Sequence, residues 1–142
     1  MARRERPPIA PKPAPRPQRQ KREARPNEIA AFGLGISAES RAAVWLIAHG
    51  YRILARRWKS PLGEIDIIVA RRHLLVFVEV KARATLDGAA EAVTERQQQR
   101  IAAAAEIWLA ANPMPAIRDM RFDAILVAHG KLPRHIKAAF ET

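Results

Sequence analysis

Four charged side chains occur in two stretches of sequence that are otherwise strongly apolar. Glu64 and Asp66 belong to the run GEIDIIVA, and Glu79 and Lys81 belong to the run LLVFVEVKA. Burying a charged group is costly unless the group is paired or bound to a metal ion. These four residues are therefore the candidates for chemistry.

The spacing of the four residues predicts that they share one face of a β-hairpin. Side chains alternate across a strand, so residues two apart point to the same side. If opposing residue numbers in the hairpin add up to 145, Asp66 lies opposite Glu79. Glu64 then lies opposite Lys81. A slip of one residue would put the pairs on opposite faces. Arg-His at 72–73 is unfavourable in a two-residue turn, so a four-residue loop of the same parity is an open alternative.

Such a cluster of acids needs a compensating charge. Two carboxylates about 4 Å apart repel by roughly 4 kcal/mol at an effective dielectric constant of about 20. A proton, Lys81 or a cation must relieve this repulsion. Glu39 is a candidate third acid, because it falls on the apolar face of a predicted first helix. Ligands that are all oxygen select a hard cation, Mg²⁺ or Mn²⁺.

A divalent cation beside a lysine suits phosphodiester hydrolysis. The metal polarises the phosphoryl group and lowers the pKa of a bound water. Lys81 would position that water or stabilise developing charge. The substrate would be polyanionic, which agrees with the charge balance of the chain.

The elements that must position these residues alternate between helix and strand. The predicted order is a helix at 30–49, strands at 51–58, 64–70 and 74–82, a helix from the capping box at Thr94 to 111, and a strand at 120–128. Residues 134–140 form a short helix or a closing edge strand. The run at 74–82 is almost continuously apolar, which indicates a central strand buried on both faces. The order predicts an α/β fold whose mixed sheet is flanked by helices on both faces.

Composition supports a nucleic-acid partner. The chain has 142 residues, enough for one domain, and 25 Lys and Arg against 14 Asp and Glu give a net charge of +11. This excess favours a polyanionic partner, nucleic acid or an anionic membrane surface. The absence of Cys excludes disulfides, thiolate nucleophiles and Cys-based metal sites. No apolar run approaches the roughly 18 residues of a membrane span, so we expect a cytoplasmic protein.

The first 26 residues form a separate compositional block. They contain nine Lys or Arg, two Glu and seven Pro. We expect a disordered, basic, proline-rich tail, because such a segment cannot bury enough apolar area to offset its ordering entropy. Its charge serves either phosphate affinity or solubility. Residues 27–142 remain as the folded domain.

The motifs GEIDII and VFVEVKAR resemble the YraN-like family of the PD-(D/E)XK nuclease superfamily, which is similar to archaeal Holliday junction resolvases. The resemblance covers residues 28–140. It implies a restriction-endonuclease-like core of order αβββαβ and a role in DNA processing. It also implies the site residues, which are Asp66, Glu79 and the main chain of Val80 as metal ligands, Lys81 as the catalytic lysine and Glu39 as the acid of the first helix.

The chain departs from the family pattern at Gln97, where the family usually has a lysine. If that lysine meets phosphate, Gln97, Gln98 or Arg100 must replace it here. Further candidate phosphate contacts come directly before the GEID strand and directly after the last charged strand, and they are Arg56, Arg57, Lys59 and Arg83. A plain solvated basic edge is the alternative interpretation for them.

Simpler structural roles are the alternative for the candidate residues and the expectation for the remaining polar and aromatic ones. The alternative for the main cluster is a structural ion pair formed by Asp66, Glu79 and Lys81. The alternative for Glu64 is a hydrogen bond to the preceding turn. Asp123 is expected to tie down a turn or to pair with Arg121 rather than to bind metal. The histidines are expected at the surface or at caps, and the tryptophans in packing; they are His49, His73, His129, His135, Trp45, Trp58 and Trp108.

These observations lead to one expected function and two alternatives. The first is a metal-dependent endonuclease-like protein that hydrolyses DNA, with branched or structured DNA in repair or recombination as the substrate. Resolution of a junction would need two active sites and hence a homodimer. The second is a non-catalytic nucleic-acid-binding accessory protein on a nuclease fold. The third is an interaction protein whose tail docks on an acidic partner or the ribosome.

Overall fold

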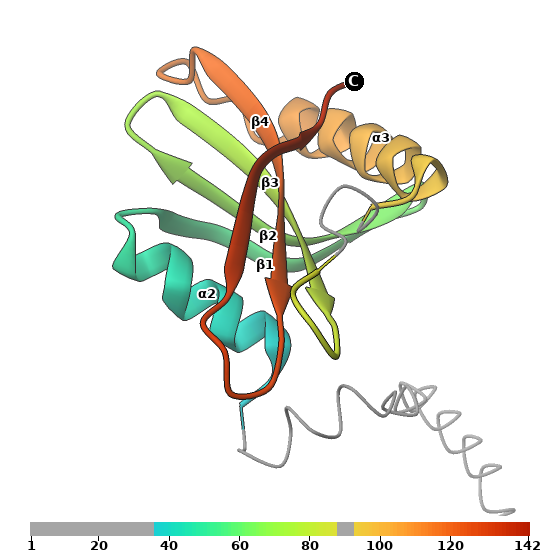
Figure 1. Cartoon of the computed structure of the whole chain (residues 1–142). Coiled ribbons are helices and arrows are strands. Elements are labelled where there is room, and N and C mark those ends of the chain that lie inside the picture. The colour runs from blue at the N-terminus through green and yellow to red at the C-terminus, as the bar shows by residue number, and fades with distance from the viewer. Residues whose placement is uncertain (1–35, 88–92) are drawn as a thin grey trace, which may run out of the picture.

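A computed structural model describes residues 36–87 and 93–142 (Figure 1). The helices and strands in these ranges follow the order α2 (Ala38–Ala48), β1 (Arg52–Ser60), β2 (Gly63–Arg71), β3 (Leu74–Ala82), α3 (Glu95–Ala111), β4 (Asp119–Val127) and β5 (Arg134–Phe140). The predicted element order is confirmed, and the last segment is a closing strand rather than a helix. The expected basic tail at 1–26 and the predicted helical residues 30–35 lie outside the described residues. No helix in the two ranges is long and apolar enough to cross a membrane.

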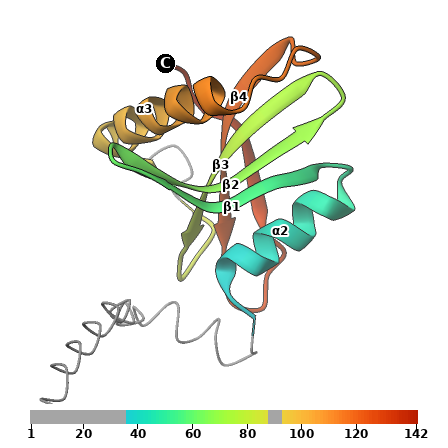
Figure 2. The ribbon, with the colours of Figure 1, turned by 180° about the vertical axis from the view of Figure 1, so that it is seen from behind.

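The five strands form one mixed sheet with a helix on each face. Their spatial order is β1-β2-β3-β4-β5. β3 and β4 run parallel, and the other neighbours are antiparallel. Figure 2 shows α2 on one side of the sheet and α3 on the other. The predicted α/β class and mixed sheet are therefore confirmed.

The central strand β3 connects two hydrophobic clusters. Leu75 and Phe77 belong to the cluster that contains the buried side chains of α3. Val76 and Val78 belong to the cluster that contains those of α2. The alternation along β3 explains its continuous apolar sequence, because both faces of the strand are buried.

Helix α2 begins later than the apolar spacing predicted. The Ser37 side chain accepts a hydrogen bond from the backbone N–H of Ser40, which caps the helix at its first turn. Leu46 is fully buried under the helix, but Ile36 and Ile47 are exposed. Although Ile36 and Ile47 also fit the apolar spacing of a helix in the sequence, the face that meets the sheet is centred on the small residues before Leu46.

The register between β2 and β3 is the predicted one. Every pair from Arg71 with Leu74 to Ile67 with Val78 has residue numbers that add up to 145. The strands join through a two-residue turn, and Arg72 adopts a left-handed conformation there with φ of +55°. The open alternative of a four-residue loop is thereby excluded.

The sheet divides beyond the pair Ile67 with Val78. From this point β2 stays paired with β1 as far as Ser60 with Gly63. β3 stays paired with β4 as far as Ala82 with Val127. Figures 1 and 2 show the β1–β2 turn beside the start of α3 while β3 continues in another direction.

Gly63 allows the β1–β2 turn to dock against α3. A Cβ atom at this position would lie 2.8 Å from the carbonyl oxygen of Arg100. Any other residue would therefore push the turn away from the helix. Asp66 follows three residues later on β2, in the part of the strand that pairs with β1 but no longer with β3.

Candidate functional site

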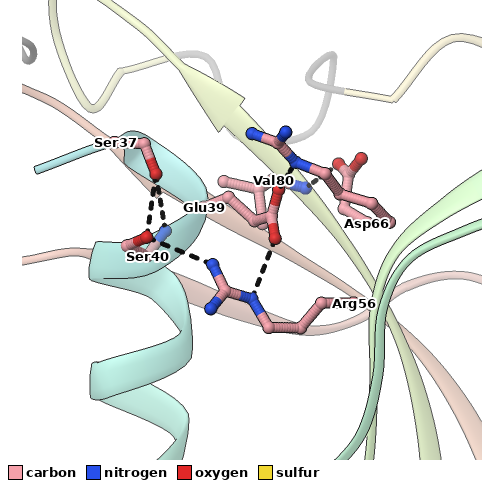
Figure 3. A network of polar contacts seen from close by, with 7 residues as sticks. Ser37, Glu39, Ser40, Arg56, Asp66 and Val80 are labelled. Carbon is pink, nitrogen blue, oxygen red and sulfur yellow. Dashed lines mark hydrogen bonds and ion pairs between the residues drawn. The ribbon is translucent and has the colours of Figure 1, made fainter.

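Asp66 lies at the point where β2 and β3 part. It is the first residue of β2 beyond the last pair with β3. Its Oδ2 accepts a hydrogen bond from the backbone N–H of Val80 over 2.8 Å (Figure 3). The carboxylate thus accepts the hydrogen bond that a backbone carbonyl of β2 would accept if the two strands stayed paired. Because the sheet divides here, the carboxyl group of Asp66 can reach the Val80 N–H and is held in place by it.

Glu79 and Lys81 complete a compact charged cluster with Asp66. Lys81 Nζ lies 3.2 Å from Glu79 Oε1, and the two side chains are only 13% and 14% exposed. Burial is the largest influence on the Asp66 carboxyl, and the neighbouring Glu79 charge is the next. Together they raise the pKa of Asp66 to about 8, against the lowering effect of the Val80 hydrogen bond. The structure therefore brings together the three residues that the sequence spacing placed on one face.

Glu64 does not reach the position opposite Lys81 that the register predicted for it. β2 has left β3 by this residue, and Glu64 is paired instead with Lys59 of β1. Its side chain is exposed. It still raises the pKa of Asp66 through its charge. Its contribution to the cluster is therefore electrostatic.

Glu39 faces the sheet from the first turn of α2, as expected, but its charge is already compensated. Its side chain is 12% exposed, and it accepts hydrogen bonds from Arg56 Nε over 2.9 Å and from Arg57 Nε over 2.5 Å. Figure 3 shows the Arg56 contact and, in the same view, the hydrogen bond between Val80 and Asp66. In the part of the chain that the structure describes, no three His, Asp or Glu side chains converge closely enough to hold one metal ion. The predicted pocket of three carboxylates is therefore not assembled with Glu39 in this position.

The glutamines proposed as phosphate contacts are used at the start of α3. Gln97 Oε1 accepts from the backbone N–H of Thr94, and the Thr94 hydroxyl accepts from the backbone N–H of Gln97. This reciprocal pair confirms the predicted capping box. Gln98 Nε2 donates to the carbonyl of Val93. In this conformation both side chains serve the helix terminus rather than projecting toward a substrate.

The basic candidates remain more accessible. Arg56 and Arg57 are 44% and 55% exposed in spite of their contacts with Glu39. Lys59 and Arg100 line a surface hollow of about 340 Å³ between the β1–β2 turn and α3, together with Glu64. Arg83 follows β3 directly, and its backbone N–H donates to the carbonyl of Val127.

The match to a protein family covers all of this site. The family model described as "Uncharacterised protein family UPF0102" matches residues 38–127, from the start of α2 to the end of β4. The chain belongs to the UPF0102 family. The YraN-like resemblance of the GEID and FVEVK motifs is thereby confirmed at the level of this family.

Three bacterial UPF0102 proteins are similar to this chain over most of their length. One from Rhodopseudomonas palustris (strain HaA2) is 66% identical over 116 residues, which cover 82% of this chain and 91% of that protein. One from Bradyrhizobium diazoefficiens is 63% identical over 118 residues, which cover 83% and 89%. One from Nitrobacter winogradskyi is 60% identical over 113 residues, which cover 80% and 96%.

A second polar network in this UPF0102 chain lies in the core between β4 and β5. Asp123 is fully buried and accepts two hydrogen bonds from Arg121, over 2.7 and 2.8 Å. It also accepts from His135 Nε2 over 2.7 Å and from the backbone N–H of Ala138 over 3.0 Å. Arg121 in turn donates to the hydroxyl of Tyr51. The predicted pairing of Asp123 with Arg121 is confirmed.

The expectation that His135 lies at the surface or at a cap is wrong. Its side chain is almost buried against Asp123, because the antiparallel pairing of β5 with β4 folds it back over the sheet. No local pattern in the sequence predicts this contact, because it depends on the strand pairing that places His135 opposite Ile125, two residues from Asp123 on β4. His49 is the C-cap residue of α2, and its ring bonds the carbonyl of Trp45, whereas His73 is an exposed residue whose ring bonds the carbonyl of Ala116.

Proposed function

We propose that this UPF0102 protein is a metal-dependent, endonuclease-like member of the PD-(D/E)XK superfamily that hydrolyses phosphodiester bonds in DNA. One observation carries the proposal. Where β2 and β3 part, the carboxyl groups of Asp66 and Glu79 meet, and Lys81 Nζ lies 3.2 Å from Glu79. An acid pair beside a lysine on diverging strands is an arrangement suited to holding a cation and a phosphate next to each other.

The charges and donor types at this site fit a divalent cation. Lys81 supplies one positive charge against two carboxyl groups, and the raised pKa of Asp66 indicates that a proton makes up the difference near neutral pH. Mg²⁺ or Mn²⁺ would supply that charge instead, with Asp66, Glu79 and the main chain of Val80 as oxygen donors. When bound, the ion would polarise a phosphoryl oxygen and acidify a water.

The burial of Lys81 favours a catalytic role over that of an ordinary surface lysine. Its ammonium group is largely shielded from solvent and held by Glu79. An ammonium fixed in this way would orient an attacking water or stabilise the negative charge that develops on the phosphoryl group. Asp66 is oriented independently by the N–H of Val80.

The surroundings of the site favour a polyanionic substrate. Exposed or partly exposed arginines lie on the strands and helix that border it, and they are Arg56, Arg57, Arg83 and Arg100. The net charge of +11 favours the same partner. We propose branched or structured DNA of repair or recombination as the substrate, and a homodimer where two strands must be cut.

A cleavage assay tests the proposal. The full chain is incubated with branched, flapped and single-stranded DNA in Mg²⁺ or Mn²⁺, and we expect cuts that EDTA abolishes. Lys81→Ala and Asp66→Asn should each remove the activity, whereas Lys137→Ala, at an exposed lysine of β5, should retain it. Cleavage that survives Lys81→Ala would discard the mechanism.

The pairing of Glu39 with two arginines favours a second candidate function, a non-catalytic nucleic-acid-binding protein on the same fold. In that case DNA binds without a divalent cation, and Asp66→Asn leaves the affinity unchanged. Calorimetric titration with Mn²⁺ separates the two functions, because only the first requires the cation to bind at Asp66.

A further inference from the structure

Arg57 stands out among the basic residues near the site because of its backbone. Its neighbours pair across to β2 as Arg56 with Ile67 and Trp58 with Ile65, so Arg57 occupies the position opposite Asp66. Its φ is +49°, although it lies inside a strand. Left-handed conformations of long side chains are unfavourable and cluster at functional sites.

The guanidinium group of Arg57 binds one acid and lies in the field of two others. Its Nε donates to Oε2 of Glu39. The hydrogen bond and charge of Glu39 are the largest influences that raise the pKa of Arg57, and the charges of Glu64 and Asp66 add to them. Arg57 therefore combines a left-handed backbone with a guanidinium group that the acids of the site influence from across the β1–β2 pair.

The adjacent arginine provides an internal comparison. Arg56 binds the other oxygen of Glu39 over 2.9 Å, and its Nη2 also donates to the hydroxyl of Ser40. Both of its partners belong to α2, so Arg56 ties the helix to the sheet. Arg57 has the greater exposure of the two, 55% against 44%, and its guanidinium group can turn toward solvent.

We propose that Arg57 is an exchangeable counter-ion, which pairs with Glu39 while the acidic site lacks a divalent cation and moves to a substrate phosphate when the cation binds. A divalent cation at Asp66 and Glu79 would repel the guanidinium group of Arg57, which lies within the electrostatic reach of Asp66 while it pairs with Glu39. A phosphate beside the cation would then offer the strongest acceptor within reach. The inference rests on the proposed function, and it assigns to Arg57 a role that Arg56 does not share.

Calorimetric titration of the full chain with Mn²⁺ tests the exchange. Because Arg57→Gln removes a positive charge that competes with the cation, we expect the Mn²⁺ affinity to increase by about three- to tenfold. Arg57→Lys should restore an affinity near that of the wild type, and Arg56→Gln should change it by less than about twofold. A purely structural salt bridge would give no increase.

Binding of a short DNA duplex, with Ca²⁺ or with EDTA, provides the second measurement. We expect Arg57→Gln to weaken binding in Ca²⁺ more than in EDTA, since only the cation releases the guanidinium group from Glu39. An equal loss in both conditions, or an unchanged Mn²⁺ affinity of Arg57→Gln, overturns the exchange while leaving the proposed function intact. Failure of the wild-type chain to bind Mn²⁺ overturns both.

Discussion

The backbone N–H of Val80 donates to Oδ2 of Asp66 over 2.8 Å, across the point where two neighbouring strands stop pairing. The carboxylate replaces the strand partner that Val80 lost, and in doing so it is held against Glu79. A main-chain donor therefore sets the orientation of the acid. An isosteric amide can accept the same hydrogen bond, so the charge of Asp66 can be removed without removing its position.

Asp66→Asn should make the protein more stable at alkaline pH in the absence of divalent cations. The folded-state pKa of about 8 lies above the ordinary value of 3.8, so the folded protein binds more protons than the unfolded chain between these values. The free energy of unfolding of the wild type should therefore fall as pH rises from about 4 to about 8. The amide is free of this penalty, and we expect a gain above about 1 kcal/mol near pH 9.

Urea unfolding in EDTA, near pH 5 and near pH 9, measures this difference. Asp119→Asn is the matched control, because Asp119 is an exposed acid at the start of β4. The control should follow the wild-type pH dependence. A gain for Asp66→Asn that is the same at both pH values would mean that Asp66 does not carry the unfavourable charge.

Gly63→Ala should destabilise the fold and disturb the acid site. The new Cβ would approach the Arg100 carbonyl to 2.8 Å, which involves backbone on both sides and cannot be relieved by a side-chain rotation. Overpacking of this kind costs about 1–3 kcal/mol. Thermal unfolding gives the loss, and Leu62→Ala in the same turn, at an exposed leucine, should leave the melting temperature nearly unchanged. Equal melting temperatures for Gly63→Ala and the wild type would contradict the close docking of the turn on α3.

The buried Asp123 should govern the loss of stability in acid. Burial by itself raises the pKa of Asp123, but hydrogen bonds from His135, Arg121 and the Ala138 N–H outweigh it, and the net pKa lies below 3.8. Its stabilising effect is therefore complete above the unfolded-state pKa and is lost as pH falls through the lower folded-state value.

Asp123→Asn should lower the free energy of unfolding by about 3 kcal/mol at neutral pH, since it leaves Arg121 without its buried partner. The variant should also lose less stability than the wild type on acidification. Denaturant titrations from about pH 7 to about pH 3 provide the measurement, with Asp119→Asn again as the exposed control. An unchanged acid dependence in Asp123→Asn would assign the acid sensitivity to other carboxylates.

Much of the site could be predicted because it depends on local regularities. The strict alternation along a strand and the short connection at 72–73 are sufficient to place Asp66 opposite Glu79. The capping box at Thr94 is also a local pattern, and it is confirmed. The hairpin register follows from these features without knowledge of the rest of the fold.

The unpredicted features depend on contacts between distant segments. The sheet divides beyond the pair Ile67 with Val78, and the β1–β2 turn docks on α3, so Glu64 does not face Lys81. His135 is buried because the pairing of β5 with β4 places it opposite Ile125, near Asp123. Neither the docking of the turn nor this strand pairing has a signature in the spacing of residues along the chain.

Bound DNA should lie at the end of the sheet where Asp66 is found rather than at the β2–β3 turn. Arg83 follows β3 and Arg100 contacts the β1–β2 turn, so both lie toward the end of the sheet where β2 and β3 part at Asp66. Arg72 lies at the opposite turn, and the strand from Asp66 to Arg71 spans roughly 17 Å. If phosphates bind beside the acid site, Arg83→Gln and Arg100→Gln should each weaken duplex binding, and Arg72→Gln should not.

Each lost phosphate contact should reduce the slope of log affinity against log salt by about 0.9. Fluorescence anisotropy of a labelled duplex at several salt concentrations, in EDTA to prevent cleavage, measures both quantities, and a larger effect of Arg72→Gln would place the nucleic acid at the wrong end of the sheet for hydrolysis at Asp66.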